Sequence, residues 1–257
     1  MNLSRLVDYF LPWFLPLALM GVWFVGSRSG WIPPQELPAP GAVVRSAIAL
    51  TKSGELPHHL GTSAKRAVVG LAIGGGIGFL LALANGLSKW SRNFSDSSVQ
   101  MLRTIPHLAL IPLVIIWFGI GEEAKRFLIV TGVLFPIYIN TFHGIRSLDP
   151  KLIEMGRVYG FGPWALFSQI IFPGALPSIL VGLRYALGLM WLTLIVAETV
   201  ATDSGIGYMT MNAREFLQTD VVVLGILLYA LLGKLADGTV VLLERWFLRW
   251  NPSYRHA

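Results

Sequence analysis

Long apolar runs separated by polar segments dominate the pattern of hydrophobic and polar positions along this chain. Each run is close to the roughly 20 residues that a helix needs to cross the hydrocarbon core of a bilayer. The pattern therefore predicts an all-α, polytopic membrane protein with six transmembrane helices. The predicted spans are residues 10–26, 67–87, 104–121, 127–143, 178–200 and 221–243.

The first run has two interpretations. A signal peptide would also begin with an apolar run, but no small-residue cleavage site follows this one. Pro12, Pro16 and two tryptophans favour a retained span with aromatic side chains at the membrane interface. We expect residues 1–57 to form this helix and an extracytoplasmic connection, residues 58–250 the transmembrane core, and residues 251–257 a cytoplasmic tail.

Residues 27–66 form the first long polar segment, which is rich in proline between Ile32 and Pro40. Such a composition is typical of irregular, partly extended chain. We expect this segment to be a long connection outside the membrane.

Small residues recur at every fourth position of the second span. This spacing places them on one helical face, where they permit another helix to approach closely. The run Gly74–Gly78 also invites interpretation as a phosphate loop, but no strand precedes it and no Gly-Lys-Ser/Thr follows it. We therefore predict a tightly packed neighbouring helix and no nucleotide site. The small residues are Gly70, Gly74, Gly78, Ala82 and Gly86.

Prolines interrupt the third and fourth spans. Pro106, Pro112 and Pro136 predict kinked helices there. Six spans place both termini on one side of the membrane, and the distribution of Lys and Arg slightly favours the cytoplasmic side. The C-terminal segment supports that orientation, because Trp246 and Trp250 alternate with arginines as in an interfacial anchor.

Composition narrows the class of protein. Of the 257 residues, 54% are hydrophobic and 13% are charged, whereas a soluble domain averages about 25% charged residues. An ordinary soluble enzyme is therefore excluded. The absence of cysteine excludes a disulfide scaffold, a cysteine-ligated metal site and a cysteine nucleophile. The net charge of +6 is spread singly between apolar runs, so it forms no clustered basic face for nucleic acid.

A motif of two blocks lies between the fourth and fifth spans, at about residues 144–177. Its spacing resembles the EAA loop of ABC importer permeases, E-A-A-x3-G-x9-I-x-L-P. Met155 and Gly156 stand in place of the usual alanines, and Phe172 replaces the leucine. The positions of the motif are Glu154, Met155, Gly156, Gly160, Ile170, Ile171, Phe172 and Pro173.

The resemblance covers nearly the whole chain and is to the membrane subunit of aliphatic sulfonate importers. It implies the type I ABC importer permease fold and the transport of aliphatic sulfonates, with taurine, nitrate or another small organic solute as alternatives. The further segments that carry it are residues 101–120, 135–149, 186–201 and 205–223.

The resemblance also implies the partners of the chain. They are a second copy in a homodimer, a cytoplasmic ABC ATPase dimer and an extracytoplasmic substrate-binding protein, assembled in the cell inner membrane. Because this chain has no phosphate loop, ATP-Mg must be used by a separate ATPase subunit. We expect no cofactor on this chain, which is then a transport subunit and not an enzyme.

A physical argument also gives this loop a role. A short surface helix transmits force only if it is rigid against its own bundle and complementary to a moving partner. The alternative is an amphipathic helix lying on lipid, which requires no fixed intervals along the sequence. The predicted coupling residues are Glu154, Arg157, Tyr159, Gly160, Phe161 and Pro173.

Charged residues inside predicted spans are candidates for function. In the fifth span, Arg184, Trp191 and Glu198 share one helical face that we expect to contact protein or water, while Thr193 points elsewhere. We interpret this face as part of the translocation pathway, with Trp191 at the constriction, Arg184 attracting the anion and Glu198 organising the outer gate. The alternative is that Arg184 and Glu198 reach the headgroup regions at the two membrane surfaces.

Other polar residues in the spans favour structural roles or leave the role open. Lys234 and Asp237 are three residues apart and are expected to pair on one helical face. Asn140 either bonds a neighbouring helix or touches substrate. The histidines show no metal-ligand spacing.

The sequence lacks the motifs that are typical of two other classes of membrane protein. An intramembrane enzyme would need a nucleophile or metal motif, and neither G-x-S-x-G nor H-E-x-x-H occurs. An ATP-independent secondary transporter would usually show an internal repeat, and none is evident.

Overall fold

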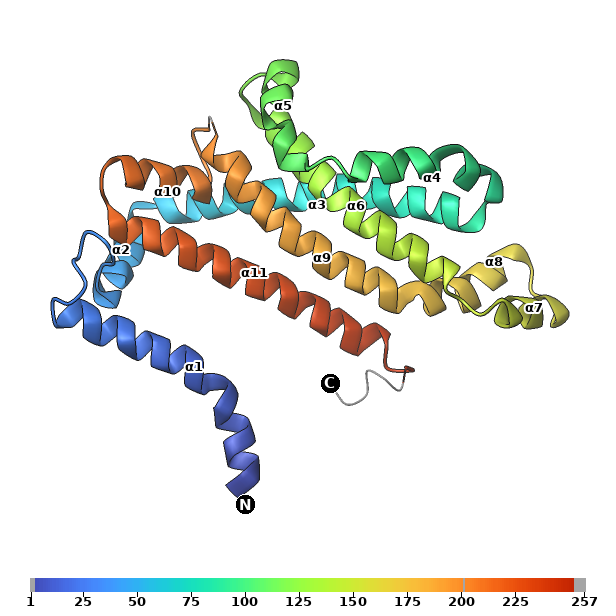
Figure 1. Ribbon diagram of the computed structural model, residues 1–257, viewed down its shortest axis with the longest axis horizontal. Helices are drawn as coiled ribbons and strands as arrows, with labels where there is room; N and C mark the ends of the chain where they lie inside the picture. Colours follow the sequence, from blue (N-terminus) through green and yellow to red (C-terminus); the bar gives the residue numbers. More distant parts are fainter. Residues whose placement is uncertain (1–2, 201, 252–257) are drawn as a thin grey trace.

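The computed structural model describes residues 3–200 and 202–251, and every regular element in them is helical (Figure 1). A 3₁₀ turn, η1 (His107–Leu110), precedes α5, and a π-helical turn, η2 (Phe167–Ile171), precedes α9. Apart from Asn251, the predicted tail lies outside the described residues. The helices are α1 (Leu3–Arg28), α2 (Pro40–Ser53), α3 (Glu55–Leu87), α4 (Lys89–Arg103), α5 (Ile111–Phe118), α6 (Glu122–Arg146), α7 (Pro150–Val158), α8 (Pro163–Leu166), α9 (Phe172–Thr199), α10 (Ile206–Glu215) and α11 (Thr219–Phe247).

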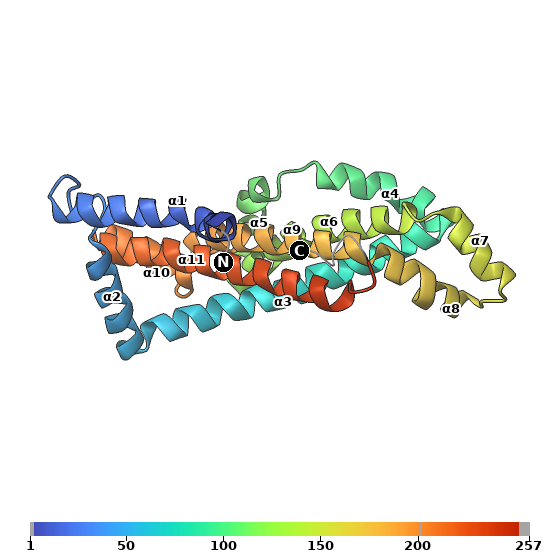
Figure 2. The same ribbon diagram turned by 90° about the horizontal axis from the view of Figure 1, so that it is seen from below.

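Four long helices, α3, α6, α9 and α11, lie side by side and form the body of the molecule (Figures 1 and 2). α6 packs against both α3 and α9, and a buried apolar cluster joins the three through Ala67, Ile129, Val133, Met190 and Leu194. α7 and α8 project from one end of this bundle, whereas α2 and α10 lie at the other end (Figure 1). The connection between α6 and α9 is therefore a bundle length away from the connection between α9 and α11.

The small-residue face predicted for the second span packs against α6. A Cβ atom added at Gly74 or Gly78 would collide with the backbone oxygen of Val130 or Leu134. The two helix backbones thus touch with no side chain between them, which confirms the predicted tight neighbour. The glycine-rich run lies inside a continuous helix and not in a loop.

The third predicted span has a different form from the one expected. α4 and the helical stretch His107–Phe118 meet at an angle of 82°. Pro106 lies at this break and Pro112 in the first turn of α5, so the predicted bend at the prolines is confirmed. The predicted run 104–121 thus contains η1 and α5, and the polar helix α4 precedes it.

The span count is confirmed in part. Among the described residues, four helices are long and apolar enough to cross a membrane, and the bent pair would be a fifth. α1 forms at the place of the first predicted span, and its shorter apolar stretch is Phe14–Arg28. α6 continues through Pro136 as one helix.

The prediction of an extended connection over residues 27–66 is wrong for most of its length. α2 begins with Pro40 in its first turn and buries Val43, and Gly54 at φ +86° separates it from α3. The hydroxyl of Ser46 donates to the carboxylate of Asp220 at the start of α11. The polar composition of this segment suggested irregular chain, whereas residues 40–53 form the helix α2, which packs on the end of the bundle.

A buried network of hydrogen bonds fixes the polar side of α4. The side-chain oxygen of Asn85, in α3, accepts from Ser91 at 2.6 Å and from Ser95 at 2.9 Å. The side-chain nitrogen of Asn85 donates to the Tyr138 hydroxyl at 2.8 Å, and Tyr138 donates to Asp96 at 2.6 Å. α4 is thereby held beside α3 and α6 with its polar groups satisfied.

Candidate functional site

A helical hairpin between α6 and α9 carries the predicted coupling motif. Gly160 ends α7 at φ +79°. The backbone N–H of Gly160 donates to the Arg157 carbonyl at 3.0 Å, and that of Phe161 donates to the Gly156 carbonyl at 2.9 Å. This pair of bonds is a Schellman turn, in which the left-handed position favours glycine. The motif's landmark glycine is therefore the residue that turns α7 towards α8.

The start of α7 is equally well defined. The side chain of Asp149 caps the helix by accepting the backbone N–H of Lys151 at 2.9 Å. Pro150 occupies the first turn, where a missing N–H costs nothing. Both ends of this nine-residue helix are thus specified by the local sequence.

Gly156 holds the two arms of the hairpin together. It is buried, and a Cβ atom there would meet Ile170 Cδ1 at 2.6 Å and Leu166 Cδ1 at 2.8 Å. α7 therefore lies directly on α8 and η2. This contact explains why a position that usually carries a small residue is glycine in this chain.

The outer surface of the hairpin mixes apolar and charged side chains. Val158, Tyr159 and Trp164 expose 85%, 76% and 77% of their surfaces. Glu154 and Arg157 are exposed on the same short helix. Large apolar side chains that are exposed in this way indicate a surface that contacts a partner protein or lipid.

The predicted coupling residues lie in different places. Glu154 and Arg157 are exposed on α7, Tyr159 is exposed at its C-terminal cap, and Gly160 forms the turn. Phe161 is half-buried after the turn. Pro173 lies apart from them, in the first turn of α9.

The opposite end of the bundle holds a buried ionic network. Arg66 on α3 and Glu198 on α9 expose only 3% and 0% of their surfaces, and Arg66 Nη1 donates to Glu198 Oε1 at 2.8 Å. Arg66 also pairs with Glu122, at the start of α6, and Lys125 donates to Glu122 at 3.2 Å. Two positive and two negative side chains thus neutralise one another and link α3, α6 and α9.

Glu198 is the centre of this network. Its carboxylate accepts from the Ser63 hydroxyl at 2.8 Å, from the backbone N–H of Gly207 at 3.0 Å and from the Tyr229 hydroxyl at 3.2 Å. The carboxylate of Glu198 is thus enclosed by α3, α10 and α11 and is fully hydrogen-bonded within the protein.

Arg66, Glu122 and Tyr229 are among the members that the sequence analysis missed, as are Ser63 and Lys125. Arg66 and Glu122 stand at the edges of apolar runs, where charges are usually solvated. The only signal in the sequence was that Arg66 and Glu198 adjoin the same ends of antiparallel spans.

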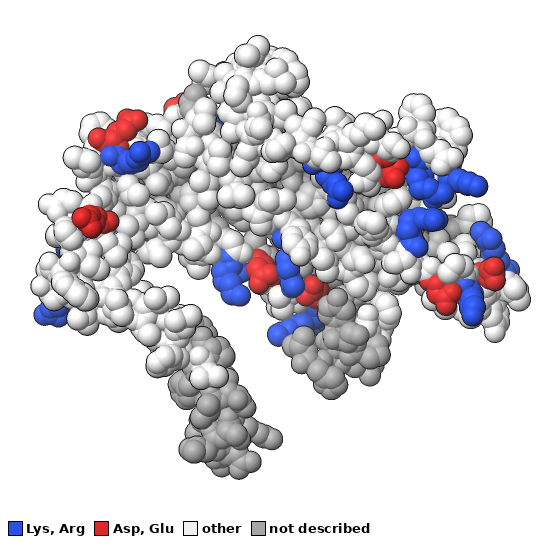
Figure 3. Space-filling model, in the orientation of Figure 1, with Lys and Arg blue, Asp and Glu red and all other residues white. Residues whose placement is uncertain are grey.

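Charged residues also join α9 to α11 midway along the bundle. Arg184 Nε lies 3.1 Å from Asp237 Oδ1, and Arg184 Nη2 lies 2.8 Å from Glu244 Oε2. Lys234 Nζ lies 3.6 Å from Asp237 Oδ2, which confirms the predicted pair. Figure 3 shows charged groups along α9 and α11, with wide uncharged surface around them. Arg184 thus contacts α11 through two carboxylates while 40% of its side chain stays exposed.

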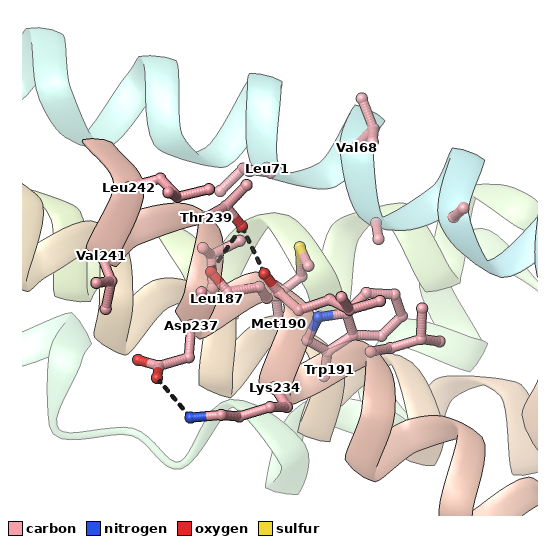
Figure 4. Close-up of a pocket in the computed structure, with 16 residues that line it drawn as sticks. Val68, Leu71, Leu187, Met190, Trp191, Lys234, Asp237, Thr239, Val241 and Leu242 are labelled. Carbon is pink, nitrogen blue, oxygen red and sulfur yellow. Dashed lines mark hydrogen bonds and ion pairs between the residues drawn. The ribbon is translucent and has the colours of Figure 1, made fainter. Parts of the chain in front are cut away.

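Trp191 lines a cavity of about 780 Å³ between α3, α9 and α11 (Figure 4). On the other side of α9, the Thr193 hydroxyl lies 2.9 Å from His107 Nε2. Trp191 and Thr193 therefore face different neighbours, as their spacing predicted. The Asn140 amide donates to the Pro136 carbonyl of its own helix at 2.9 Å, whereas the sequence left open a bond to a neighbouring helix or a contact with substrate. No cluster of His, Asp or Glu suited to a metal occurs in the described part of the chain.

Comparison with known families decides the class of this protein. Residues 74–249 match the family described as binding-protein-dependent transport system inner membrane component. The chain belongs to this family. Membership makes it a multi-pass membrane component of a transport system, and residues 74–249 include the second part of α3, the rest of the helical bundle and the whole hairpin.

Individual members of the family are similar over most of their length. The chain is 60% identical over 243 residues to an aliphatic sulfonates transport permease protein of Escherichia coli (strain K12), covering 95% of this chain and 92% of the relative. It is 46% identical over 240 residues to a protein of the same description from Bacillus subtilis (strain 168), covering 93% and 87%. A taurine transport system permease protein of Escherichia coli (strain K12) is 34% identical, covering 91% and 86%.

Solved structures of ABC transporters share the fold. An amino acid ABC transporter chain superposes with a TM-score of 0.62 at 16% identity, covering 77% of this chain and 97% of that one. A chain of the MetNI methionine ABC transporter superposes with a TM-score of 0.52 at 19% identity, covering 73% and 94%. The helical bundle is therefore the ABC importer permease fold that the sequence resemblance implied.

Proposed function

We propose that this chain is the membrane-spanning permease subunit of an ATP-driven importer of aliphatic sulfonates. The observation that carries this proposal is the 60% identity to an aliphatic sulfonates permease, compared with 34% to a taurine permease. The identity extends over nearly the full length of both chains, so it includes the hairpin and the buried networks.

The hairpin α7–α8 is the element that receives force from the ATPase. It is compact, because the Schellman turn and the Gly156 contact fix its two arms against each other. It presents exposed Val158, Tyr159 and Trp164 for a partner's cleft. A rigid hairpin with an open apolar surface transmits displacement to α6 and α9, the two helices that it joins.

The working assembly has two copies of this chain, two cytoplasmic ATPase chains and an extracytoplasmic binding protein. Both termini lie on the cytoplasmic side together with the hairpin. The ATPase subunit binds ATP-Mg, and this chain needs no cofactor of its own. Family membership supports the binding protein and the ATPase, since the family serves binding-protein-dependent transport.

Within the membrane, the face of α9 that holds Arg184, Trp191 and Glu198 belongs to the translocation pathway. Trp191 borders an open cavity, whereas Glu198 is enclosed and holds the outer ends of the helices in place. Arg184 is paired with two carboxylates, so the positive potential that it offers to an anion is modest. A pathway needs that modest attraction, because a strong site would trap the cargo.

Uptake into proteoliposomes tests this function. The permease, its ATPase and its binding protein are reconstituted, and uptake of pentanesulfonate, taurine and nitrate is measured with ATP or with an ion gradient alone. We expect ATP-dependent uptake of pentanesulfonate at a higher kcat/KM than taurine, and none driven by the gradient. Gradient-driven uptake, or a preference for taurine or nitrate, would contradict the proposal.

A further inference from the structure

The cavity beside Trp191 lies between α3, α9 and α11 and is lined mainly by apolar side chains. Its lining is apolar over most of its area and includes Val68 and Leu71 of α3, Met190 of α9 and Leu242 of α11. Its volume of about 780 Å³ is in the range of small-molecule sites, roughly 300–1,000 Å³. The helices around it leave room for a ligand with an apolar chain.

One cation borders this cavity near the middle of its helix. Lys234 lies 15 residues after Thr219 and 13 before Phe247, the two ends of α11. At 1.5 Å per residue, it is about 20 Å from either end, and so close to the centre of a bilayer core about 30 Å thick. An ammonium group at this depth cannot face lipid tails without a large cost, so it must face water or an anion.

The ion pairs leave the ammonium group of Lys234 weakly engaged. Its side chain is 81% exposed, and its distance of 3.6 Å from Asp237 is longer than a hydrogen bond. Asp237 is bound more closely by Arg184, at 3.1 Å, and Arg184 is bound again by Glu244. Of the two cations in these ion pairs, Lys234 is therefore the one whose N–H donors remain free to bind a ligand. Figure 4 shows Lys234 at the cavity with Asp237.

A second donor lies in the cavity wall. The indole Nε1 of Trp191 is buried and has no hydrogen-bond partner. An indole N–H can only donate, and a buried donor without an acceptor is rare in folded proteins. The hydroxyl of Thr239 also lies at the cavity, but its contacts, at 2.8 Å, are with the carbonyl oxygens of Leu235 and Ala236 in its own helix and not with this indole.

The cavity thus combines an apolar wall, an ammonium group and an unused N–H donor. An alkanesulfonate has the complementary parts, which are an alkyl chain and a head with a fixed negative charge and three acceptor oxygens. We propose that this cavity is an intramembrane binding site for the alkanesulfonate during transport. Lys234 and Trp191 hold the sulfonate head, and Val68, Leu71 and Met190 contact the alkyl chain.

The same chemistry excludes shorter zwitterionic cargo from this site. Taurine carries an ammonium group on a two-carbon chain, so it would place a positive charge near Lys234 and leave the apolar wall unfilled. The site therefore adds selectivity for longer alkyl chains inside the membrane. This inference rests on the proposed function, because it takes aliphatic sulfonates as the cargo.

Direct binding tests the site separately from transport. The permease–ATPase complex is placed in lipid nanodiscs without the binding protein, and binding of ethane-, pentane- and octanesulfonate and of taurine is measured by calorimetry. We expect affinity to rise with chain length and taurine not to bind. We expect Lys234→Gln to weaken pentanesulfonate binding at least 10-fold, Trp191→Phe to weaken it 3- to 10-fold, and Lys234→Arg to keep it within about 3-fold.

Lys89→Gln is the matched control, because Lys89 is an exposed lysine at the start of α4, away from the cavity. It should leave binding unchanged. Wild-type affinity in both Lys234→Gln and Trp191→Phe would overturn the site. A wild-type complex that imports pentanesulfonate but binds none without the binding protein would also overturn it and leave the proposed function intact. If the wild-type complex imports no sulfonate at all, the result contradicts the proposed function itself, and the binding site that rests on it as well.

A lipid or a second copy are the other possible occupants of the cavity. Cross-linking of Val68→Cys between two copies, unaffected by pentanesulfonate, would show that the second copy covers the cavity. A phospholipid that stays bound at saturating pentanesulfonate would show a lipid site. Either result would overturn the proposal, whereas displacement of lipid or loss of reactivity at Val68→Cys with pentanesulfonate would support it.

Discussion

At the scale of single residues, Gly156 and Gly160 are needed in the hairpin for different reasons. Gly156 is needed for space, because Ile170 and Leu166 occupy the position of a side chain. Gly160 is needed for its backbone, since it lies at φ +79° while nothing is within 4 Å of its missing Cβ. Bulk at Gly160 is therefore not blocked by this chain, and any loss there comes from the turn or from a partner.

Substitution at Gly160 separates these two causes. A left-handed conformation costs a side-chain-bearing residue about 1–2 kcal/mol, and asparagine pays less than most. We expect Gly160→Val to reduce ATPase association and uptake more than Gly160→Asn does, and Gly160→Trp to abolish both. Gly162→Ala is the control, with ordinary φ and open space. Normal association and uptake in Gly160→Trp would show that the hairpin does not couple.

Glu198 is the buried residue whose loss should cost most. Breaking a buried ion pair by removing one partner typically costs about 3–5 kcal/mol. Arg66 would keep Glu122, so we expect Glu198→Gln to fall near the lower end, about 3 kcal/mol, measured as thermal stability in detergent. Glu123→Gln breaks only the exposed pair with Arg126 and should change stability by less than about 0.5 kcal/mol. Equal effects of the two variants would contradict the account of this network.

At the scale of elements, the close contact of α3 and α6 determines how the bundle packs. A methyl group at Gly74 or Gly78 would meet the backbone of α6, which cannot move aside as a side chain can. Gly76 has nothing within 4 Å, so it serves as the matched control on the same helix.

We expect Gly74→Ala and Gly78→Ala each to lower stability by about 1–3 kcal/mol, as overpacking does, while Gly76→Ala is neutral or slightly stabilising. Thermal unfolding of the detergent-solubilised protein measures this. Indistinguishable melting of all three variants would mean that α3 and α6 do not pack as described.

Sequence patterns predicted some elements well and others poorly. The four-residue spacing of small residues and the fixed spacing around Glu154 and Gly160 are local, so they predicted a tightly packed neighbour for α3, though not that it is α6, and the place of the hairpin. α2 and α4 were missed because their polar faces bond to distant residues, such as Asp220 for α2 and Tyr138 for α4. The network of Arg66 and Glu198 joins residues 132 positions apart, and no local pattern reports such a pair.

At the scale of the whole molecule, the hairpin and the buried network lie at opposite ends of the same helices. α6 and α9 run from one to the other as continuous helices, so under the proposed function we expect a displacement of the hairpin to reach the far end. The network then holds the far ends together as a unit.

A charge reversal on the hairpin should separate transport from folding. Glu154 is exposed on α7, so Glu154→Lys should leave insertion and thermal stability within about 0.5 kcal/mol of wild type. We expect uptake to fall by at least 10-fold. Loss of detergent-stable protein would instead indicate a folding role for Glu154.

The most direct test of the account measures ATP hydrolysis and pentanesulfonate uptake together in the reconstituted complex, comparing wild type with Glu154→Lys. The account predicts that the wild type couples the two and that Glu154→Lys loses uptake while the ATPase chains keep their own activity. Uptake and hydrolysis at wild-type ratio in Glu154→Lys and in Gly160→Trp would contradict it, because force would then reach the bundle without the hairpin.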